Sequence, residues 1–141
     1  MRPNKHEYFM NIAEVVSTRS ECCRRSVGAV IVDKRGRILA TGTNGLAPGR
    51  KACGGENKCK GASCQSGTGL DLCEASHAEI SALVSCHRPY EATTLYVTTA
   101  PCVSCVKAIL LSTIETIYYR DDYPSEGKEL WERDGGDWIQ L

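Results

Sequence analysis

The sequence predicts a single α/β domain, folded as a three-layer α-β-α sandwich around a mixed central sheet. Helical and strand patterns alternate along the chain, which is the order expected when helices cover both faces of a sheet. The 141 residues suffice for one domain and for a hydrophobic core that needs no disulfides. Hydrophobic residues make up 42% and charged residues 24%, a composition typical of globular proteins.

The first half of the chain is expected to supply one helix and a hairpin. Residues 6–17 place apolar side chains at helical spacing. Residues 27–33 are rich in β-branched side chains, and a turn signal follows at 34–37 before a second strand at 38–43. Between residues 44 and 73 lie seven Gly and four Cys, which predicts an insertion loop. A loop this long is unusual unless something holds it together, and its thiols suggest a metal.

The second half is expected to alternate helices with short strands. We predict that Ser76 caps a helix that buries Ile80, Leu83 and Val84, and that Pro101 opens the next helix, at a position where proline is tolerated. The predicted elements are a helix at 76–86, a strand at 95–98, a helix at 101–111, a strand at 116–119, a helix at 126–133 and a strand at 138–141.

The charge balance limits the classes of partner. Lys and Arg total 17, as do Asp and Glu, so the formal net charge is zero. Zero net charge argues against broad electrostatic binding of nucleic acid or of an acidic membrane. The first ten residues hold no apolar signal core, and no apolar run is long enough to span a membrane. We therefore expect a cytoplasmic protein that binds neither nucleic acid nor membrane.

The chain has nine cysteines, an odd number that cannot pair completely within one chain. In a reducing compartment, clustered cysteines more often bind metal or catalyse reactions than form disulfides. Some cysteines could instead be small buried hydrophobic residues, and this alternative stays open above all for Cys23 and Cys86.

Two short motifs indicate a catalytic zinc site. They are His77-Ala78-Glu79 and Pro101-Cys102-Val103-Ser104-Cys105, each at a predicted helix start. Alone, each is weak: a C-x-x-C can be half a zinc site or a redox pair, and a lone histidine is usually structural. Cys102 and Cys105 share one helical face, and a helix N-terminus favours thiolates.

His77 would be the third ligand, which leaves the fourth tetrahedral position of zinc open to water. Zinc lowers the pKa of such a water from about 15.7 to about 7. Glu79, two residues from His77, can reach this water without binding the metal.

The pattern H-x-E…P-C-x-x-C is the signature of the zinc nucleobase deaminases. Over about residues 19–124, the chain resembles the zinc-dependent deoxycytidylate (dCMP) deaminases of the cytidine deaminase-like superfamily. The matching segments are 19–22, 27–32, 38–45, 72–79 and 95–102. The resemblance implies hydrolysis of dCMP to dUMP and ammonia, a step toward thymidylate. Zinc-bound hydroxide would attack C4 of the cytosine while Glu79 carries protons between the water, N3 and the leaving amine.

The resemblance also implies a set of substrate contacts. Asn44 would bind the sugar hydroxyl, and Arg25 is the candidate for the 5′-phosphate because a guanidinium suits a phosphate. Arg25 could also be a solvated surface residue, and Tyr123 could serve ordinary packing. The other residues expected near the substrate are Ser26, Val27, Thr98, Ala100 and Tyr123.

Some members of this family hold a second, structural zinc. The corresponding thiols here are Cys22, Cys53, Cys59 and Cys73. Cys64 could replace Cys59 or remain a free thiol.

Regulation is a further implied property. Related enzymes are homohexamers activated by dCTP and inhibited by dTTP, with magnesium accompanying the nucleotide, and Arg88 resembles an arginine that serves this control. The chain departs from the family at Thr43, where a tyrosine is usual, and at Ser81, where an asparagine is usual.

Two other readings compete with a dCMP deaminase. One is a deaminase of the same fold that acts on free cytidine, guanine or a tRNA adenosine. A tRNA enzyme should carry a basic face, and a free-nucleoside enzyme needs no phosphate-binding arginine. The other is a non-catalytic zinc-binding relative of the competence type, against which Glu79 argues, because a structural site has no use for that carboxylate.

Overall fold

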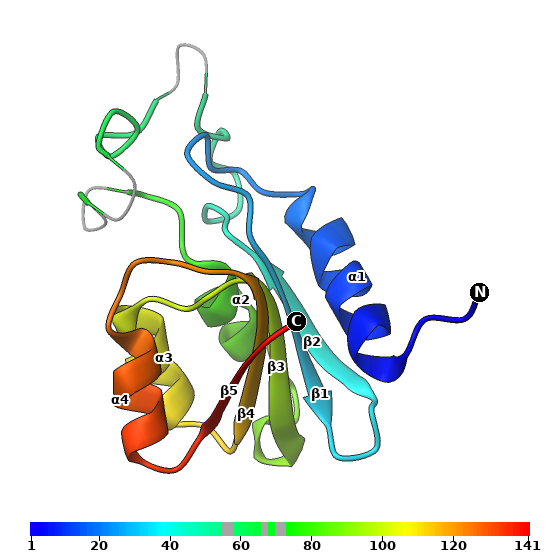
Figure 1. Cartoon of the computed structure of the whole chain (residues 1–141). Coiled ribbons are helices and arrows are strands. Elements are labelled where there is room, and N and C mark those ends of the chain that lie inside the picture. The colour runs from blue at the N-terminus through cyan, green and yellow to red at the C-terminus, as the bar shows by residue number, and fades with distance from the viewer. Residues whose placement is uncertain (55–57, 66–67, 70–72) are drawn as a thin grey trace.

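The fold is taken from a computed structural model, which describes residues 1–54, 58–65, 68–69 and 73–141. Figure 1 shows the elements in chain order. They are α1 (Lys5–Ser17), β1 (Gly28–Asp33), β2 (Ile38–Thr43), α2 (Ala78–Ser85), the 3-10 turn η2 (Pro89–Glu91), β3 (Ala92–Thr99), α3 (Val103–Leu110), β4 (Thr116–Asp121), α4 (Gly127–Arg133) and β5 (Asp137–Gln140).

The strands form one five-stranded sheet in the order β2-β1-β3-β4-β5. Strand β1 runs antiparallel to both β2 and β3, whereas β3, β4 and β5 run parallel to one another. Helix α1 covers one face, and α2, α3 and α4 cover the other (Figure 1). The predicted three-layer sandwich with a mixed sheet is therefore confirmed.

Strand β1 shows why the sheet needs helices on both faces. Val30 and Val32 pack with Phe9 of α1, whereas Ala29 and Ile31 point into the core under the other three helices. Successive strand residues face opposite sides, so a strand with both faces covered is apolar throughout. This accounts for the unbroken apolar run in β1.

Three local predictions in the second half are wrong. Helix α2 begins at Ala78, and Ser76 does not cap it because the Ser76 backbone pairs with Gly45 (N···O 2.8 and 3.1 Å). Pro101 precedes helix α3 rather than opening it, since Cys102 is the N-cap residue. Val84 is 81% exposed, and Ala82 occupies the buried side of α2 instead.

The long loop between residues 44 and 73 was expected to lack regular structure. Residues 55–57, 66–67 and 70–72 lie outside the described part of the chain. The part of the loop that is described contains turns and isolated bridges but neither helix nor strand. Among all described residues, no helix is long and apolar enough to cross a membrane.

Gly42 sets the distance between strand β2 and helix α2. A Cβ built on Gly42 would lie 2.4 Å from the carbonyl oxygen of Ala78 and 2.4 Å from the amide nitrogen of Ala82. We expect Gly42→Ala to push strand and helix apart and to lower the free energy of unfolding by about 1–3 kcal/mol, as overpacking does. Urea titration measures the loss, with the exposed neighbour Thr41→Ala as a control expected within about 0.5 kcal/mol of the native protein. Equal stability of Gly42→Ala and the native protein would contradict this close packing.

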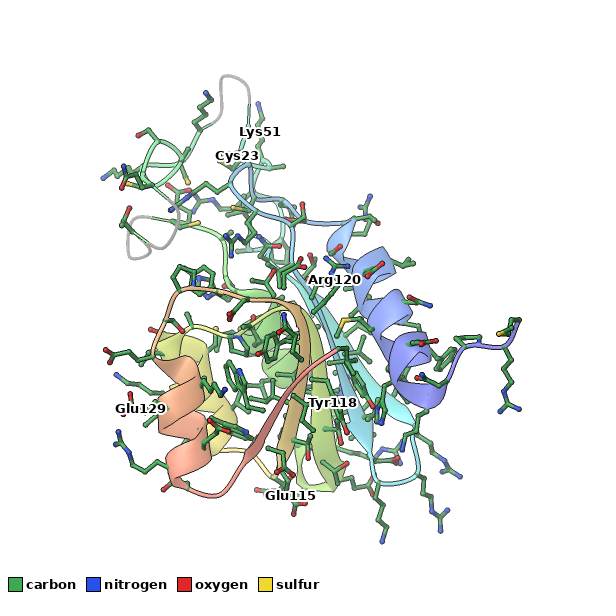
Figure 2. The ribbon with its side chains drawn as sticks, viewed as in Figure 1. Cys23, Lys51, Glu115, Tyr118, Arg120 and Glu129 are labelled. Carbon is green, nitrogen blue, oxygen red and sulfur yellow. The ribbon has the colours of Figure 1, made fainter. Side chains whose placement is uncertain are left out.

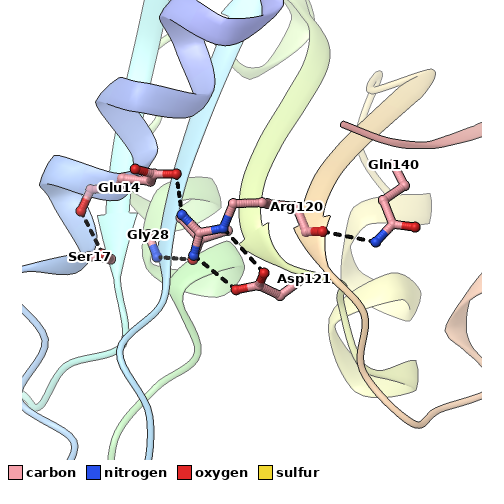
Figure 3. Close-up of polar contacts among 7 residues, drawn as sticks. Glu14, Ser17, Gly28, Arg120, Asp121 and Gln140 are labelled. Carbon is pink, nitrogen blue, oxygen red and sulfur yellow. Dashed lines mark hydrogen bonds and ion pairs between the residues drawn. The ribbon is translucent and has the colours of Figure 1, made fainter.

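Arg120 on β4 ties helix α1 to the sheet. Figure 3 shows its guanidinium between Glu14 of α1 and Asp121, whose Oδ2 lies 2.9 Å from Nη2. The Arg120 carbonyl accepts a hydrogen bond of 3.0 Å from Gln140 of β5. Because the Arg120 side chain is 40% exposed, solvent screens these ion pairs, and each contributes at most about 1 kcal/mol. The network therefore orients α1 more than it stabilises it.

Candidate active site

The candidate site lies at the end of the sheet where β3 finishes. The first residue of strand β1 and the last residue of strand β2 lie at this same end, because β1 is antiparallel to both β2 and β3. The residues just before α2 and α3 also lie here, which brings His77 and Cys102 together. Segments far apart in the sequence thus converge on one site.

His77, Cys102 and Cys105 form a compact ligand cluster. Their ligand atoms all lie within 4.8 Å of one another. Nδ1 of His77 is 3.2 Å from Sγ of Cys105 and 3.4 Å from Sγ of Cys102. Two thiols and one imidazole are donors that suit zinc, and three protein ligands are the set found in catalytic zinc sites. The residues present therefore fit the predicted zinc, and the predicted ligand set is confirmed.

The two thiols of this cluster differ electrostatically. Hydrogen bonds from the Cys105 thiol and from His77 lower the pKa of Cys102 to about 4. The same bond to Cys102, together with burial, raises the pKa of Cys105. The hydrogen bond with Cys102 also raises the pKa of His77. A thiol with a lowered pKa is readily deprotonated, which suits Cys102 to bind a divalent cation as a thiolate.

Glu79 lies in the first turn of α2, next to the zinc ligands. It is only 4% exposed, and burial raises its pKa to about 7. The neighbouring His77 opposes this shift, and its own backbone N–H does so more strongly. A carboxyl group that titrates near neutral pH can both accept and donate a proton during a reaction.

A cavity of about 310 Å³ joins Glu79 and the zinc ligands to the start of β1. Its size lies in the range of about 300–1,000 Å³ usual for small-molecule sites. His77, Glu79 and Cys102 line it. The predicted substrate residues that also line this cavity are Arg25, Val27, Asn44, Ala100 and Tyr123.

Asn44 is held rigidly in this wall. Its Oδ1 accepts a hydrogen bond of 2.9 Å from the Val27 N–H, and its Nδ2 donates one of 2.6 Å to the Arg25 carbonyl. The neighbouring Thr43 hydroxyl donates to the Val27 carbonyl at 2.8 Å. These bonds join the end of β2 to the start of β1, so the side chain of Asn44 is positioned before any ligand arrives.

Arg25 and Tyr123 contact each other in the cavity wall. The Arg25 guanidinium carbon lies 4.8 Å from the centre of the Tyr123 ring, a cation–π distance. Burial, followed by the charge of Cys102, raises the pKa of Tyr123. Both residues therefore belong to the cavity that contains the zinc ligands.

Three predicted residues lie outside the cavity wall. The Thr98 hydroxyl is buried and accepts a hydrogen bond of 3.1 Å from the Gly28 N–H, and Thr99 lines the cavity instead. Ser26 is exposed and does not line the cavity. Arg88 follows α2 on the surface, where it pairs with Glu91 at 3.4 Å.

Three thiols of the long loop lie at a second cavity, of about 240 Å³. The four cysteines predicted for a second zinc all line it: Cys22, Cys53, Cys59 and Cys73. Cys22 and Cys73 line the catalytic cavity as well, whereas Cys64 lines the catalytic cavity but not the second one, which favours Cys59 over Cys64 in this cluster.

Sequence reasoning missed Cys23 and Arg24. The sulfurs of Cys23 and Cys53 are 2.8 Å apart, and the Cys23 thiol lowers the pKa of Cys53 to about 7. Cys23 lies in the loop region above the sheet (Figure 2). Arg24 lines the catalytic cavity beside Arg25. No spacing signal distinguishes either residue from its neighbour, because the segment between α1 and β1 is irregular.

Comparisons with known proteins identify the family. Residues 3–121 match the model of the cytidine and deoxycytidylate deaminase zinc-binding region. The chain is 40% identical over 124 residues to a deoxycytidylate deaminase of Mycobacterium phage D29, covering 84% of this chain and 95% of that protein. It is 35% identical over 136 residues to ComE operon protein 2 of Bacillus subtilis, covering 92% and 67%.

A solved structure shares both fold and sequence. It is the dCMP deaminase of cyanophage S-TIM5 in complex with dCMP and dUMP, with a TM-score of 0.77 and 30% identity over 100% of this chain and 99% of that one. Together with the zinc-ligand cluster and the buried Glu79, these matches show that the chain belongs to the zinc-dependent cytidine and deoxycytidylate deaminases, a family of hydrolases.

Proposed function

We propose that this protein hydrolyses dCMP to dUMP and ammonia. The observation that carries the proposal is the buried Glu79 beside the ligand cluster of His77, Cys102 and Cys105, in a cavity that two arginines also line. The phage D29 relative is a deoxycytidylate deaminase, and the S-TIM5 structure holds dCMP and dUMP, which supports this choice of substrate.

The zinc ligands and Glu79 have different roles in the proposed reaction. Zinc, when bound by His77 and the two thiols, would supply a Lewis acid that lowers the pKa of water, so that hydroxide is available at neutral pH to attack a ring carbon. Glu79 takes one proton from the attacking water and delivers it to N3 of the cytosine ring. It then takes the proton of the new C4 hydroxyl and delivers it to the amine, so that the C4–N bond breaks and ammonia leaves. Burial suits Glu79 to this role, because a pKa near 7 permits both directions of transfer.

The remaining cavity residues hold the substrate. Asn44 presents its fixed amide to the sugar hydroxyl. Val27 and Ala100 flank the base, with Ser26 and Thr98 supporting the same strand ends. Arg25 and Tyr123 form the wall toward the 5′ side.

Parallel assays of dCMP, deoxycytidine and CMP test the proposed activity. We expect ammonia release and the formation of dUMP from dCMP, with a kcat/KM for dCMP well above that for the other two. Faster turnover of deoxycytidine would transfer the assignment to a nucleoside deaminase. Release of ammonia from none of the three would favour a non-catalytic zinc-binding protein.

We also propose a second, structural zinc at the loop thiols. Cys22, Cys53, Cys59 and Cys73 line one cavity, and the Cys59 N–H donates a hydrogen bond of 3.4 Å to Sγ of Cys53. Four thiol ligands leave no open position, which is typical of structural zinc. Such a site would fasten the long loop to the segment before β1.

The expected zinc content is two per chain, measured by elemental analysis of the native protein. Cys53→Ser should lower it to one while the catalytic zinc remains, because the Cys53 thiol is not part of the ligand cluster at His77. Cys86→Ser, at the end of α2, is the matched control and should keep both ions. One zinc per chain in the native protein would contradict the second site.

Assembly and regulation extend the proposal. The family resemblance favours a homohexamer and control by dCTP and dTTP with magnesium, in which Arg88 would serve as a regulatory contact. Arg88 is exposed and pairs with Glu91 at 3.4 Å, so a nucleotide phosphate would compete with Glu91 for the guanidinium. A dCMP saturation curve that dCTP and magnesium leave unchanged would remove regulation from the account.

A further inference from the structure

We propose that Cys23 and Cys53 are a redox-responsive thiol pair, which a small disulfide compound converts into a reversible disulfide. Cys23 lies between α1 and β1, and Cys53 lies in the long loop, 30 residues further along the chain. The ligand cluster at His77 contains neither thiol, and the proposed deamination uses neither. The disulfide would tie the segment before β1 covalently to the long loop.

The two sulfurs already lie close together. Both thiols are free, and their Sγ atoms are 2.8 Å apart. A disulfide bond is about 2.05 Å long, so its formation requires the sulfurs to approach by less than about 1 Å. Two thiolates that bind one tetrahedral zinc at about 2.3 Å are separated by about 3.8 Å, which is clearly more than the separation here. The geometry of this pair therefore suits a disulfide better than shared coordination of a metal.

The backbone holds the two thiols near one another. The Cys53 N–H donates a hydrogen bond of 2.9 Å to the carbonyl of Glu21, two residues before Cys23. The Glu21 N–H in turn donates one of 3.1 Å to the carbonyl of Asn44, just after β2. The long loop is thus paired with the segment before β1 at the position where the thiols meet, so formation of the disulfide needs no large change in the fold.

Access and charge indicate the class of oxidant. Cys23 is exposed, and Cys53 is partly exposed at the second cavity, which Arg50, Lys51 and Lys58 also line. Figure 2 shows Cys23 and Lys51 in the same region above the sheet. Accessible cysteines beside positive charges are typically reactive, whereas buried structural cysteines are inert. The positive charges also attract anions, so we expect a small disulfide that carries carboxylates, with oxidised glutathione as the probe.

The exchange takes place in two steps. One thiolate of the pair attacks a sulfur of the small disulfide, forms a mixed disulfide and expels the first small thiolate. The other thiolate of the pair then attacks the protein sulfur of the mixed disulfide, forms the bond between Cys23 and Cys53, and expels the second small thiolate. Two protein thiols are thereby oxidised and one small disulfide is reduced to two thiols, which take up the two protons that the protein thiols released. Excess reduced thiol reverses both steps.

Oxidation would compete with the proposed second zinc for Cys53. A sulfur in a disulfide is no longer a thiolate, so it cannot be one of the thiolate ligands of a structural zinc. Cys22 and Cys73, two of the other proposed ligands, line the catalytic cavity as well as the second one. The pair would thus connect the redox state of the surrounding thiols to the loop beside the catalytic cavity. In a reducing compartment, such a disulfide is transient and regulatory rather than structural.

Peptide mapping by mass spectrometry detects the disulfide. The full-length protein is incubated with oxidised glutathione, alkylated and digested with trypsin, which cleaves after Lys and Arg. In the native protein we expect residues 20–24 to be linked to residues 52–58, with the loss of two of the nine free thiols. Dithiothreitol should break this link and restore both thiols. Elemental analysis of the oxidised protein should show one zinc fewer per chain than in the reduced protein.

Two neighbouring substitutions separate this inference from the proposed second zinc. Cys23→Ser should lose the link and keep the zinc content of the native protein. Cys22→Ser is the matched control, because it removes the adjacent thiol: it should keep the link and lose the second zinc. If the native protein holds a single zinc and still forms the link, the second zinc site fails and the thiol pair stands.

Three results would overturn the inference. The first is a native protein that forms no link between residues 20–24 and 52–58 in oxidised glutathione. The second is a Cys23→Ser variant that keeps the link, which would assign it to Cys22. The third is an oxidised protein that carries the link and still holds two zinc ions, which would exclude competition at Cys53. Turnover of dCMP enters none of these measurements, so failure of the proposed function leaves the inference intact.

Discussion

Glu79→Gln is expected to lower kcat for dCMP by about 10²- to 10⁴-fold while the protein keeps its full zinc content. Gln has nearly the shape of Glu, so the buried site at the start of α2 can accommodate it. It cannot take a proton from water or return one to the ring, and the mechanism assigns both transfers to this one carboxyl. Loss of turnover without loss of metal is therefore the signature of a proton carrier.

The measurement pairs steady-state deamination of dCMP with elemental analysis of zinc. Glu129→Gln, on the exposed side of α4, makes the same substitution outside the candidate site. It should have the rate and the zinc content of the native protein. A Glu79→Gln variant with a near-native rate would exclude Glu79 as the proton carrier. A variant that loses zinc would instead assign Glu79 a role in holding the metal site.

Cys102→Ser is expected to remove one zinc per chain and to lower turnover by at least about 10³-fold, because the metal contributes several kcal/mol of transition-state stabilisation. Cys102 is the N-cap residue of α3 and lies 3.4 Å from Nδ1 of His77, so its thiolate connects α3 to the start of α2. We also expect a lower Tm, since ligand binding to the native state stabilises it and this variant loses that ligand.

Cys86→Ser serves as the control for Cys102→Ser, because it removes a partly buried thiol from the end of α2 without touching the ligand cluster. It should keep the native zinc content and the native rate. Unchanged zinc content in Cys102→Ser would contradict the ligand set.

The catalytic zinc site could be predicted from sequence because its residues lie in short local motifs. The C-x-x-C spacing places Cys102 and Cys105 on one helical face whatever the rest of the chain does. The position of His77 directly before a helix brings it to the same end of the sheet. Helix geometry therefore determined the part of the site that was predicted correctly.

The errors in α2 have a tertiary cause. Residue size favoured Val84 for the buried side, but the close approach at Gly42 leaves room only for Ala78 and Ala82. The end of β3 shows a similar effect. Side chains alternate across a strand, so a shift of one residue exchanges Thr98, which faces the Gly28 backbone, for Thr99, which lines the cavity.

The irregular segment before β1 resisted prediction for another reason. Cys22, Cys23, Arg24 and Arg25 follow one another outside any helix or strand. Where side chains do not repeat with a helical or strand period, the sequence does not indicate which way each one points. Only the structure shows that Cys23 lies beside Cys53, whereas the next residue, Arg24, lines the catalytic cavity.

Deamination of dCMP in ¹⁸O-labelled water tests the central claim most directly. The proposed reaction adds a water oxygen to C4 and expels the amine, so each dUMP should carry one ¹⁸O atom and each turnover should release one ammonia. Mass spectrometry of dUMP, with ammonia measured in the same sample, reads both quantities. Absence of dUMP, or dUMP without the label, would contradict hydrolysis at the site built from His77, Glu79, Cys102 and Cys105.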